Sequence, residues 1–351
     1  MGIQQTFCCG TFSKRGLKKT GIYIALVFLI TGCSDTRPGA DIGNIDAGIA
    51  IRRLEVDLFE IDVDIDSIPV QAKILEQKYG EFFDIFNHLI IRIGSPSSPA
   101  YPEHLHRFLT DMDIYRIRTE VDSIFGDLSW LENDLENAFR HFLYYFPDYE
   151  APRIYTYLSG FNQSVVTSEG IIGIGLDKYL GADHFFYSQL HLPMYQRRNM
   201  HPGKIVSDVM MAWAMMEFEF DNTEDNLLSH IIHHGKLLYF TDAVLPDQHD
   251  TLKTGFTARQ LEWCRKNEDL MWTYLVENRL LFSTDARTIG RFVNPAPFTR
   301  EFTSDSPGTA AIWLGWQIVS SYMNRHRNVT LGELMADNDY QKILNQARYR
   351  P

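Results

Sequence analysis

The stretch Asn226–Phe240, NLLSHIIHHGKLLYF, decides how this chain is interpreted. Its apolar residues recur at the three- and four-residue spacing of a helix with one buried face. Ahead of it, Thr223–Asp225 supply a predicted N-cap and acids that suit the positive end of the helix dipole. His230 and His234 are four residues apart. We therefore expect their side chains one helical turn apart, at the border of the buried face.

Two histidines at this spacing form the frame of the zinc-protease motif H-E-x-x-H, in which the glutamate after the first histidine is the general base. Ile231 occupies that position and would project into the apolar face. No residue stands where the activating base belongs. The favoured interpretation is therefore an amphipathic core helix with a histidine-rich flank.

A zinc-dependent peptidase or hydrolase with an unusual base is the alternative. Zinc needs a third ligand besides His230 and His234, and the following helix offers glutamates that could reach it, Glu277 among them. Glu262 or Glu277 would then have to activate the water. The sequence contains no G-x-S-x-G elbow, P-loop or dinucleotide-binding glycine motif. We therefore predict no catalytic residue and no cofactor.

Residues 1–33 indicate a bacterial lipoprotein signal. Four basic residues precede an apolar run of 11 residues, Gly21–Thr31, which is too short to cross a bilayer as a helix. The run ends in the motif Ile30–Cys33, ITGC, so Cys33 is predicted to be lipidated and to become the first residue of the mature chain. The competing interpretation, myristoylation of Gly2, would leave the apolar run unexplained.

Composition and charge narrow the possible partners. The chain is 45% hydrophobic and 13% aromatic, which is typical of a folded protein. Its formal net charge is −12, and the predicted signal carries only basic charges, so the mature chain is more acidic still. Such a body argues against nucleic acid as a partner and leaves the acyl chains as the membrane contact. With Cys33 lipidated, Cys264 is the one remaining cysteine, expected in the core.

The remaining patterns predict a mostly helical α+β fold with a small sheet. Three strands within 153–176 are separated by short turns, which favours an antiparallel meander packed on helices. Gly173 and Gly175 would leave bare backbone on one face of the last strand, where a helix or a bound peptide could approach, the helix being the commoner cause. The alternating segment Arg53–Glu60 is predicted as a further strand.

Helices are expected wherever apolar residues recur at helical spacing: 70–90, two short ones within 103–125, 129–146, 205–218, 226–240, 257–282 and 308–324. Capping boxes are predicted at Ser129–Glu132 and Thr257–Gln260. Arg197 and Arg198 could form internal salt bridges or hold an anionic partner, and internal salt bridges are the favoured interpretation. Because no repeat or internal linker interrupts the chain, we expect a signal peptide at 1–32, a lipidated tether at 33–49 and a single domain at 50–351.

Six segments of the chain form a pattern whose number and order are specific, although no single segment is a chemical signature. They are Met194–Met200, His234–Asp247, Asn294–Phe302, Ser306–Gly308, Trp313–Met323 and Ile343–Pro351. Together with Cys33 they resemble the gliding-motility lipoprotein GldB family of the Bacteroidetes. The resemblance covers essentially all of the mature chain.

This resemblance implies a membrane-anchored lipoprotein that faces the periplasm, is required for gliding and is linked to other gliding proteins and the type IX secretion apparatus. It also implies a distant similarity to zincin-type metallopeptidases, with the meander packed on helix 226–240 and a late helix at 308–324. The family keeps no full H-E-x-x-H, which agrees with Ile231. The resemblance therefore implies a non-catalytic, pseudoenzyme scaffold.

Overall fold

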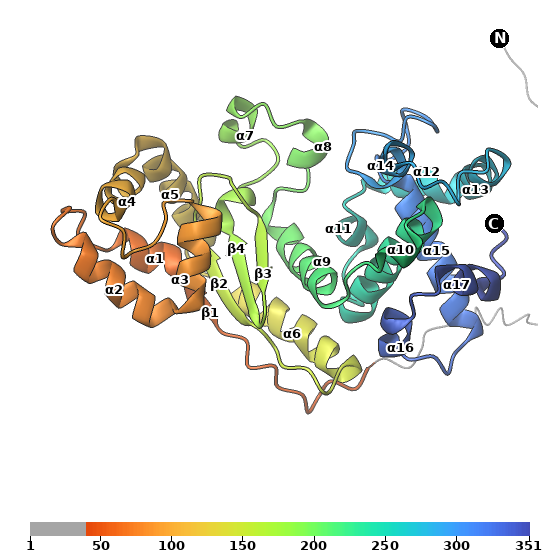
Figure 1. Ribbon diagram of the computed structural model, residues 1–351, viewed down its shortest axis with the longest axis horizontal. Coiled ribbons are helices and arrows are strands. Elements are labelled where there is room, and N and C mark those ends of the chain that lie inside the picture. The colour runs from red at the N-terminus through yellow and green to blue at the C-terminus, as the bar shows by residue number, and fades with distance from the viewer. Residues whose placement is uncertain (1–39) are drawn as a thin grey trace, which may run out of the picture. The chain divides into compact units, whose positions relative to one another are not determined.

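A four-stranded mixed sheet stands between two groups of helices in the computed structural model, which describes residues 40–351 (Figure 1). Its strands are β1 (Ile51–Arg53), β2 (Arg153–Tyr157), β3 (Val165–Ser168) and β4 (Ile171–Gly175), in the order β1-β2-β4-β3. Strand β2 runs parallel to both β1 and β4, and β3 runs antiparallel to β4. The α+β, mostly helical class is confirmed, but the predicted antiparallel meander is wrong because β4 returns to lie beside β2 instead of following β3 outward.

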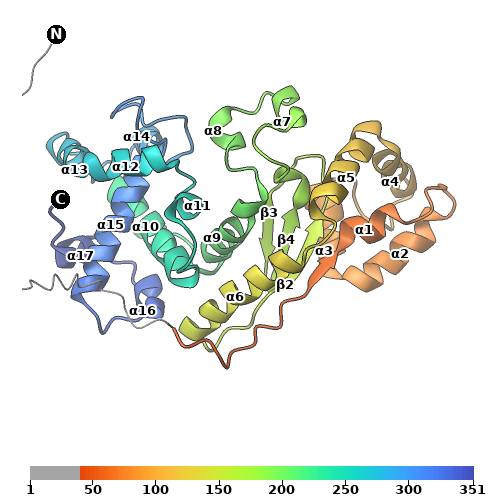
Figure 2. The same cartoon turned by 180° about the vertical axis from the view of Figure 1, so that it is seen from behind.

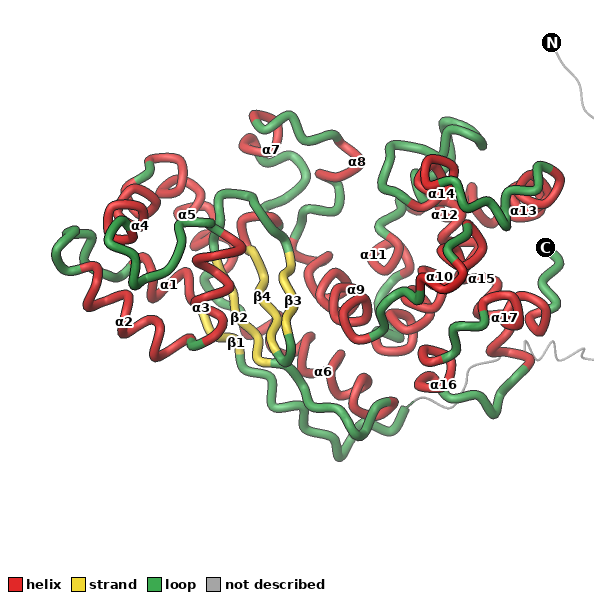
Figure 3. The backbone as a smooth tube through the Cα atoms, viewed as in Figure 1, coloured by secondary structure: helices red, strands yellow, loops and turns green. Residues whose placement is uncertain are grey.

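Helices supply most of the remaining structure (Figure 3). In chain order the α-helices are α1 (Leu54–Phe59), α2 (Ile68–Tyr79), α3 (Glu81–Ile85), α4 (Tyr101–Thr110), α5 (Met112–Phe125), α6 (Ser129–Tyr145), α7 (Phe185–Gln189), α8 (Met194–Arg197), α9 (Ile205–Glu217), α10 (Leu227–Val244), α11 (Asp250–Thr254), α12 (Ala258–Lys266), α13 (Glu268–Glu277), α14 (Ala286–Val293), α15 (Ala310–Arg325), α16 (Leu331–Ala336) and α17 (Tyr340–Ala347). A π-helical turn, η1 (Phe86–Ile90), and 3₁₀ turns, η2 (Leu176–Lys178), η3 (Pro202–Lys204) and η4 (Asn222–Glu224), complete the set. Among the described residues, none of these helices is both long and apolar enough to cross a membrane.

The two faces of the sheet bury different cores. On β2, Ile154 points into the larger core, which also holds α6, α9, α10 and α15, while Tyr155 points into a smaller aromatic core beneath α1–α4. Such alternation is the period-two pattern of a strand covered on both faces. Gly173 lies on the aromatic side, where an added Cβ would collide with the ring of Phe82 from α3. Phe82 stacks on Tyr155 with ring centroids 4.3 Å apart, so a helix of the same chain occupies the bare backbone at Gly173, as expected, whereas at Gly175 the Gln163 carbonyl and the Tyr157 ring take that place.

Several predicted boundaries change for local reasons. Arg53–Glu60 is not a strand: Leu54 and Leu58, four residues apart, are both buried on one side of α1. The long helix expected at 70–90 breaks at Gly80, whose φ of +54° is readily adopted by glycine. The helix expected at 257–282 divides at Asn267 into α12 and α13.

The other helices are confirmed within a few residues at their ends, including the pair within 103–125 and the helices at 129–146, 205–218, 226–240 and 308–324. The capping box at Thr257–Gln260 is also confirmed. The one predicted at Ser129 is wrong, because the Ser129 hydroxyl donates to Asp127 at 2.6 Å and Leu128 is the N-cap.

The described part of the predicted tether lies along α6 (Figure 2). The backbone N–H groups of Ala47 and Ile49 each donate to the Glu136 carboxylate at 2.9 Å, and that of Ile51 donates to Glu132 at 2.9 Å. Residues 40–351 accordingly form one compact unit. Cys33 and the predicted signal lie outside the described residues.

Candidate functional site

Helix α10, which carries the histidines, begins at Asn226. The Asn226 side chain accepts from the backbone N–H of Ser229 at 3.1 Å, and the Ser229 hydroxyl accepts from the backbone N–H of Asn226 at 3.0 Å. This reciprocal pair is a capping box. The N-cap predicted at Thr223 is therefore wrong by three residues, and Thr223 lies in the preceding 3₁₀ turn.

The first histidine of the predicted pair is held by neighbouring side chains. His230 Nε2 lies 2.7 Å from Asp225 Oδ1, and the ring stacks on Phe220 with centroids 4.3 Å apart. The imidazole nitrogen nearest the cap is thus committed to a carboxylate five residues earlier in the chain. This contact orients His230 along the side of α10.

Of the other two histidines, His233 is buried and His234 is half-buried. Burial is the main reason that the pKa of His233 falls to about 3 and that of His234 to about 4, and the charge of the neighbouring His230 contributes to both shifts. Both rings are therefore neutral at neutral pH. The Nδ1 atom of His233 is buried and has no hydrogen-bond partner, and this ring contacts Phe220 at 5.2 Å between centroids.

The alternative zinc ligands do not come together. Within residues 40–351, no three His, Cys, Asp or Glu side chains lie close enough to one another to hold a metal ion. Glu277 is exposed at the end of α13, and Glu262 pairs with Lys266 at 2.6 Å on the surface of α12. The set of His230, His234 and Glu277 predicted for the alternative is thus not assembled.

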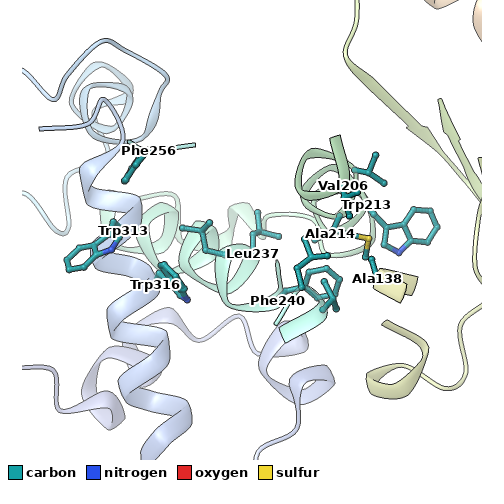
Figure 4. Packing of buried hydrophobic residues seen from close by; sticks show 14 of the residues in the cluster. Ala138, Val206, Trp213, Ala214, Leu237, Phe240, Phe256, Trp313 and Trp316 are labelled. Carbon is teal, nitrogen blue, oxygen red and sulfur yellow. The ribbon is translucent and has the colours of Figure 1, made fainter. Parts of the chain in front are cut away.

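The position of the missing base is part of a tight helix crossing. Ile231 is completely buried, and its backbone faces Gly315 of α15. A Cβ added at Gly235 would overlap the backbone of Gly315, and one added at Gly315 would overlap the carbonyl of Ile231. Figure 4 shows α10 at the centre of the larger core, with Trp313 and Trp316 of α15 on one side and Trp213 of α9 on the other. Helix α10 is therefore primarily a core helix.

On the face of the sheet that borders the larger core, the covering helix is α9. It packs on β3 and β4, whereas α10 packs on α9, α15 and α17 (Figure 1). The expected layout, with the sheet packed directly on helix 226–240, is therefore wrong. The Met-rich segment 205–218 fills that place, and its Trp213 contacts Phe139 and Phe142 of α6 at 5.9 and 6.0 Å between centroids.

A cavity of about 390 Å³ lies at the carboxyl end of β4. It is lined by residues from seven parts of the chain: Ser164, Lys178–Tyr179, the segment 195–200 except Arg197, Asp208, Thr254–Phe256 and the two loop segments 295–296 and 308–309. Ligands of parallel sheets commonly bind beyond the carboxyl ends of the strands. A second, larger cavity of about 630 Å³ lies on the far side of the Ser159–Asn162 loop, against α4, α5 and α7.

The comparison with known protein families gives a match over nearly the whole chain. The family model described as gliding motility protein GldB, a lipoprotein family, matches residues 35–351. The chain belongs to the GldB family. The comparisons found no match among curated proteins or solved structures, and they give no support for the zincin-type resemblance.

Membership in the GldB family implies involvement in gliding motility as a membrane-anchored envelope lipoprotein. Five of the six segments that carried the resemblance meet at two places in the fold. His234–Asp247 and Trp313–Met323 form the α10–α15 crossing, whereas Met194–Met200, Asn294–Phe302 and Ser306–Gly308 all contribute to the smaller cavity. The family resemblance therefore rests on a core contact and on a concave surface.

The cavity could not be located from the sequence. Lys178 and Tyr179 directly follow the strand 171–175, a position that becomes informative once β2 and β4 are known to be parallel. The predicted antiparallel meander did not include this parallel contact. The internal salt bridges expected of Arg197 and Arg198 are also not formed within residues 40–351: Arg197 Nε donates to the Ala182 carbonyl at 2.9 Å, and Arg198 Nε has no hydrogen-bond partner.

Proposed function

We propose that this GldB-family protein is a lipid-anchored, non-catalytic component of the gliding machinery that acts by binding other envelope proteins. The observation that carries the proposal is the family match over residues 35–351, which begins two residues after Cys33, the last residue of the ITGC motif. Diacylation of Cys33 would hold that body at the membrane, facing the periplasm. Its partners would be other gliding and type IX secretion proteins.

The arrangement of α10 supports a role without catalysis. Ile231 fills the position of the general base and is buried at a helix crossing, where water has no access. His230 Nε2 contacts Asp225, and within residues 40–351 His234 belongs to no group of three His, Cys, Asp or Glu side chains that could hold a metal. A hydrolase would need an activated water beside these residues. The histidines instead support a structural role at the edge of the core.

Complementation of a chromosomal deletion tests this proposal. We expect the deletion to abolish gliding, and the full-length wild type and the His230→Gln/His234→Gln variant to restore it to a similar extent. Both proteins would be purified from the native host and analysed for zinc by plasma mass spectrometry. An intact gliding phenotype in the deletion strain would overturn the role in motility.

The catalytic alternative predicts a different pattern. Zinc near one equivalent per chain, lost in the double variant together with gliding and with a chelator-sensitive peptidase activity, would replace the scaffold by a hydrolase. Restoration by a correctly folded, metal-free double variant would exclude catalysis through these histidines.

A further inference from the structure

The smaller cavity at the carboxyl end of β4 contains one acidic and two basic side chains, and the acid is already neutralised. Asp208 Oδ1 accepts from Lys204 Nζ at 2.5 Å, and Oδ2 accepts from the Tyr179 hydroxyl at 3.0 Å. The Lys204 side chain is 8% exposed and that of Asp208 is 30% exposed, so the ammonium end of this ion pair is the buried one. Asp208 is therefore not available to balance the other charges of the cavity.

The two basic side chains, Lys178 and Arg198, have no carboxylate partner within ion-pair distance among residues 40–351. Arg198 Nε is buried and makes no hydrogen bond, although a buried N–H that loses its water normally gains a partner. Lys178 Nζ donates only to the Phe161 carbonyl, at 3.3 Å. Burial lowers the pKa of both groups, because a positive charge is less stable in a buried position than in water.

The nearest buried acid is held elsewhere. Asp177 precedes Lys178, but its Oδ2 accepts from the backbone N–H groups of Ser159 and Phe161, at 3.3 and 2.5 Å. It therefore organises the loop between the two cavities and acts on Lys178 only through space.

The remaining wall has the features of a small-ligand site. Gly308 and Thr309 bring the start of α15, a helix of 16 residues, to the cavity, and Thr309 makes no side-chain cap there. The N-terminal end of a helix adds positive potential. Apolar and aromatic surface is supplied by Tyr195, Met200 and Phe256. A volume of about 390 Å³ lies within the range of small-molecule sites.

We propose that this cavity binds a small organic anion: a carboxylate or phosphate that contacts Arg198 and Lys178, attached to a compact apolar body that fills the aromatic side. The guanidinium of Arg198 offers the planar donor fork that suits either group. On a chain with a net charge of −12, two unpaired cations in one hollow create a local site for an anion that the rest of the surface repels. The inference does not depend on the lipid anchor or on the α10 histidines.

Matched probes test the charge and the body of the ligand separately. The full chain in a non-ionic detergent, at constant ionic strength, would be titrated calorimetrically with inorganic phosphate, N-acetylphenylalanine and N-acetylphenylalanine amide. We expect saturable binding of phosphate, of N-acetylphenylalanine or of both, and none of the uncharged amide. Phosphate alone would identify a phosphate-bearing ligand, and the acid alone a carboxylate.

Variants locate the site. Arg198→Gln should weaken anion binding by about tenfold or more, since it removes a charge-assisted contact, and Lys178→Gln should do so independently if Arg198→Gln fails to fold. Arg287→Gln, on the exposed side of α14, is the matched control and should bind as the wild type does. Equal binding of the acid and the amide, unchanged affinity in both cavity variants, or no binding of either anion would each overturn the proposal.

Discussion

At the scale of single residues, His233 shows that a histidine in this chain can cost stability in acid. The ring is 6% exposed, and burial, assisted by His230, His234 and Lys236, lowers its pKa to about 3. In the unfolded chain the pKa of a histidine is near its ordinary value of about 6.5. Between about pH 6.5 and pH 3, His233 therefore binds a proton in the unfolded chain and stays neutral in the folded chain. The contribution of His233 to the free energy of unfolding is therefore complete above about pH 6.5 and is lost as the pH falls toward 3.

We predict that the free energy of unfolding falls by about 2 kcal/mol for His233 alone between pH 7.5 and pH 5. Replacing it by a neutral residue, His233→Gln, should remove this part of the pH dependence, measured by urea unfolding at both pH values. Asp177, whose burial raises its pKa to about 6, has the opposite effect below pH 6 but is present in both proteins and cancels in the comparison. His88→Gln, at an exposed site, is the control, and an identical pH slope in all three proteins would contradict the prediction.

At the scale of elements, the crossing of α10 and α15 depends on two glycines. Gly315→Ala would place a methyl group against the Ile231 carbonyl, so the helices would have to separate and the surrounding core would lose contacts. We predict a loss of about 3 kcal/mol or more in the free energy of unfolding, seen as a fall in Tm. The matched control is Gly332→Ala in α16, where the nearest atom to the new Cβ is 3.7 Å away in Phe146, and where helix propensity favours alanine. Similar Tm changes in the two variants would contradict the close-packing argument.

The same elements show what the sequence could and could not predict. Local signals succeeded: the apolar spacing within 226–240 gave α10, and the side chains of Thr257 and Gln260 gave the start of α12, because both depend on residues within one or two turns. The pairing of strands could not be predicted from such local signals. Short turns made β2, β3 and β4 resemble a meander, whereas β2 pairs in parallel with β4 in a sheet that is covered by Phe82 of α3 on one face and by α9 on the other. The cavity depends on that contact, so it could not be predicted either.

At the scale of the whole molecule, the proposed site of membrane attachment and the compact folded unit occupy different segments of the chain. Residues 40–351 form a compact unit with its own two cores, and the polar interactions that hold residues 42–51 to α6 lie within it. The proposed lipid site, Cys33, precedes this unit. Loss of the lipid should therefore change where the protein is found and leave its stability unchanged.

We predict that Cys33→Ser abolishes incorporation of a labelled palmitate and moves most of the protein from the membrane fraction to the soluble fraction. Each buried CH₂ of an acyl chain contributes about 0.8 kcal/mol to membrane binding, so two chains dominate the attachment of an acidic body. The Tm of Cys33→Ser should match that of the wild type, whereas gliding should be lost because the protein no longer resides at the membrane. Gly2→Ala is the control, since it blocks the competing N-terminal modification and should leave attachment and gliding intact. A palmitate-labelled, membrane-bound Cys33→Ser protein would show that another residue carries the anchor, and normal gliding by a soluble one would show that anchoring is dispensable for the role in motility.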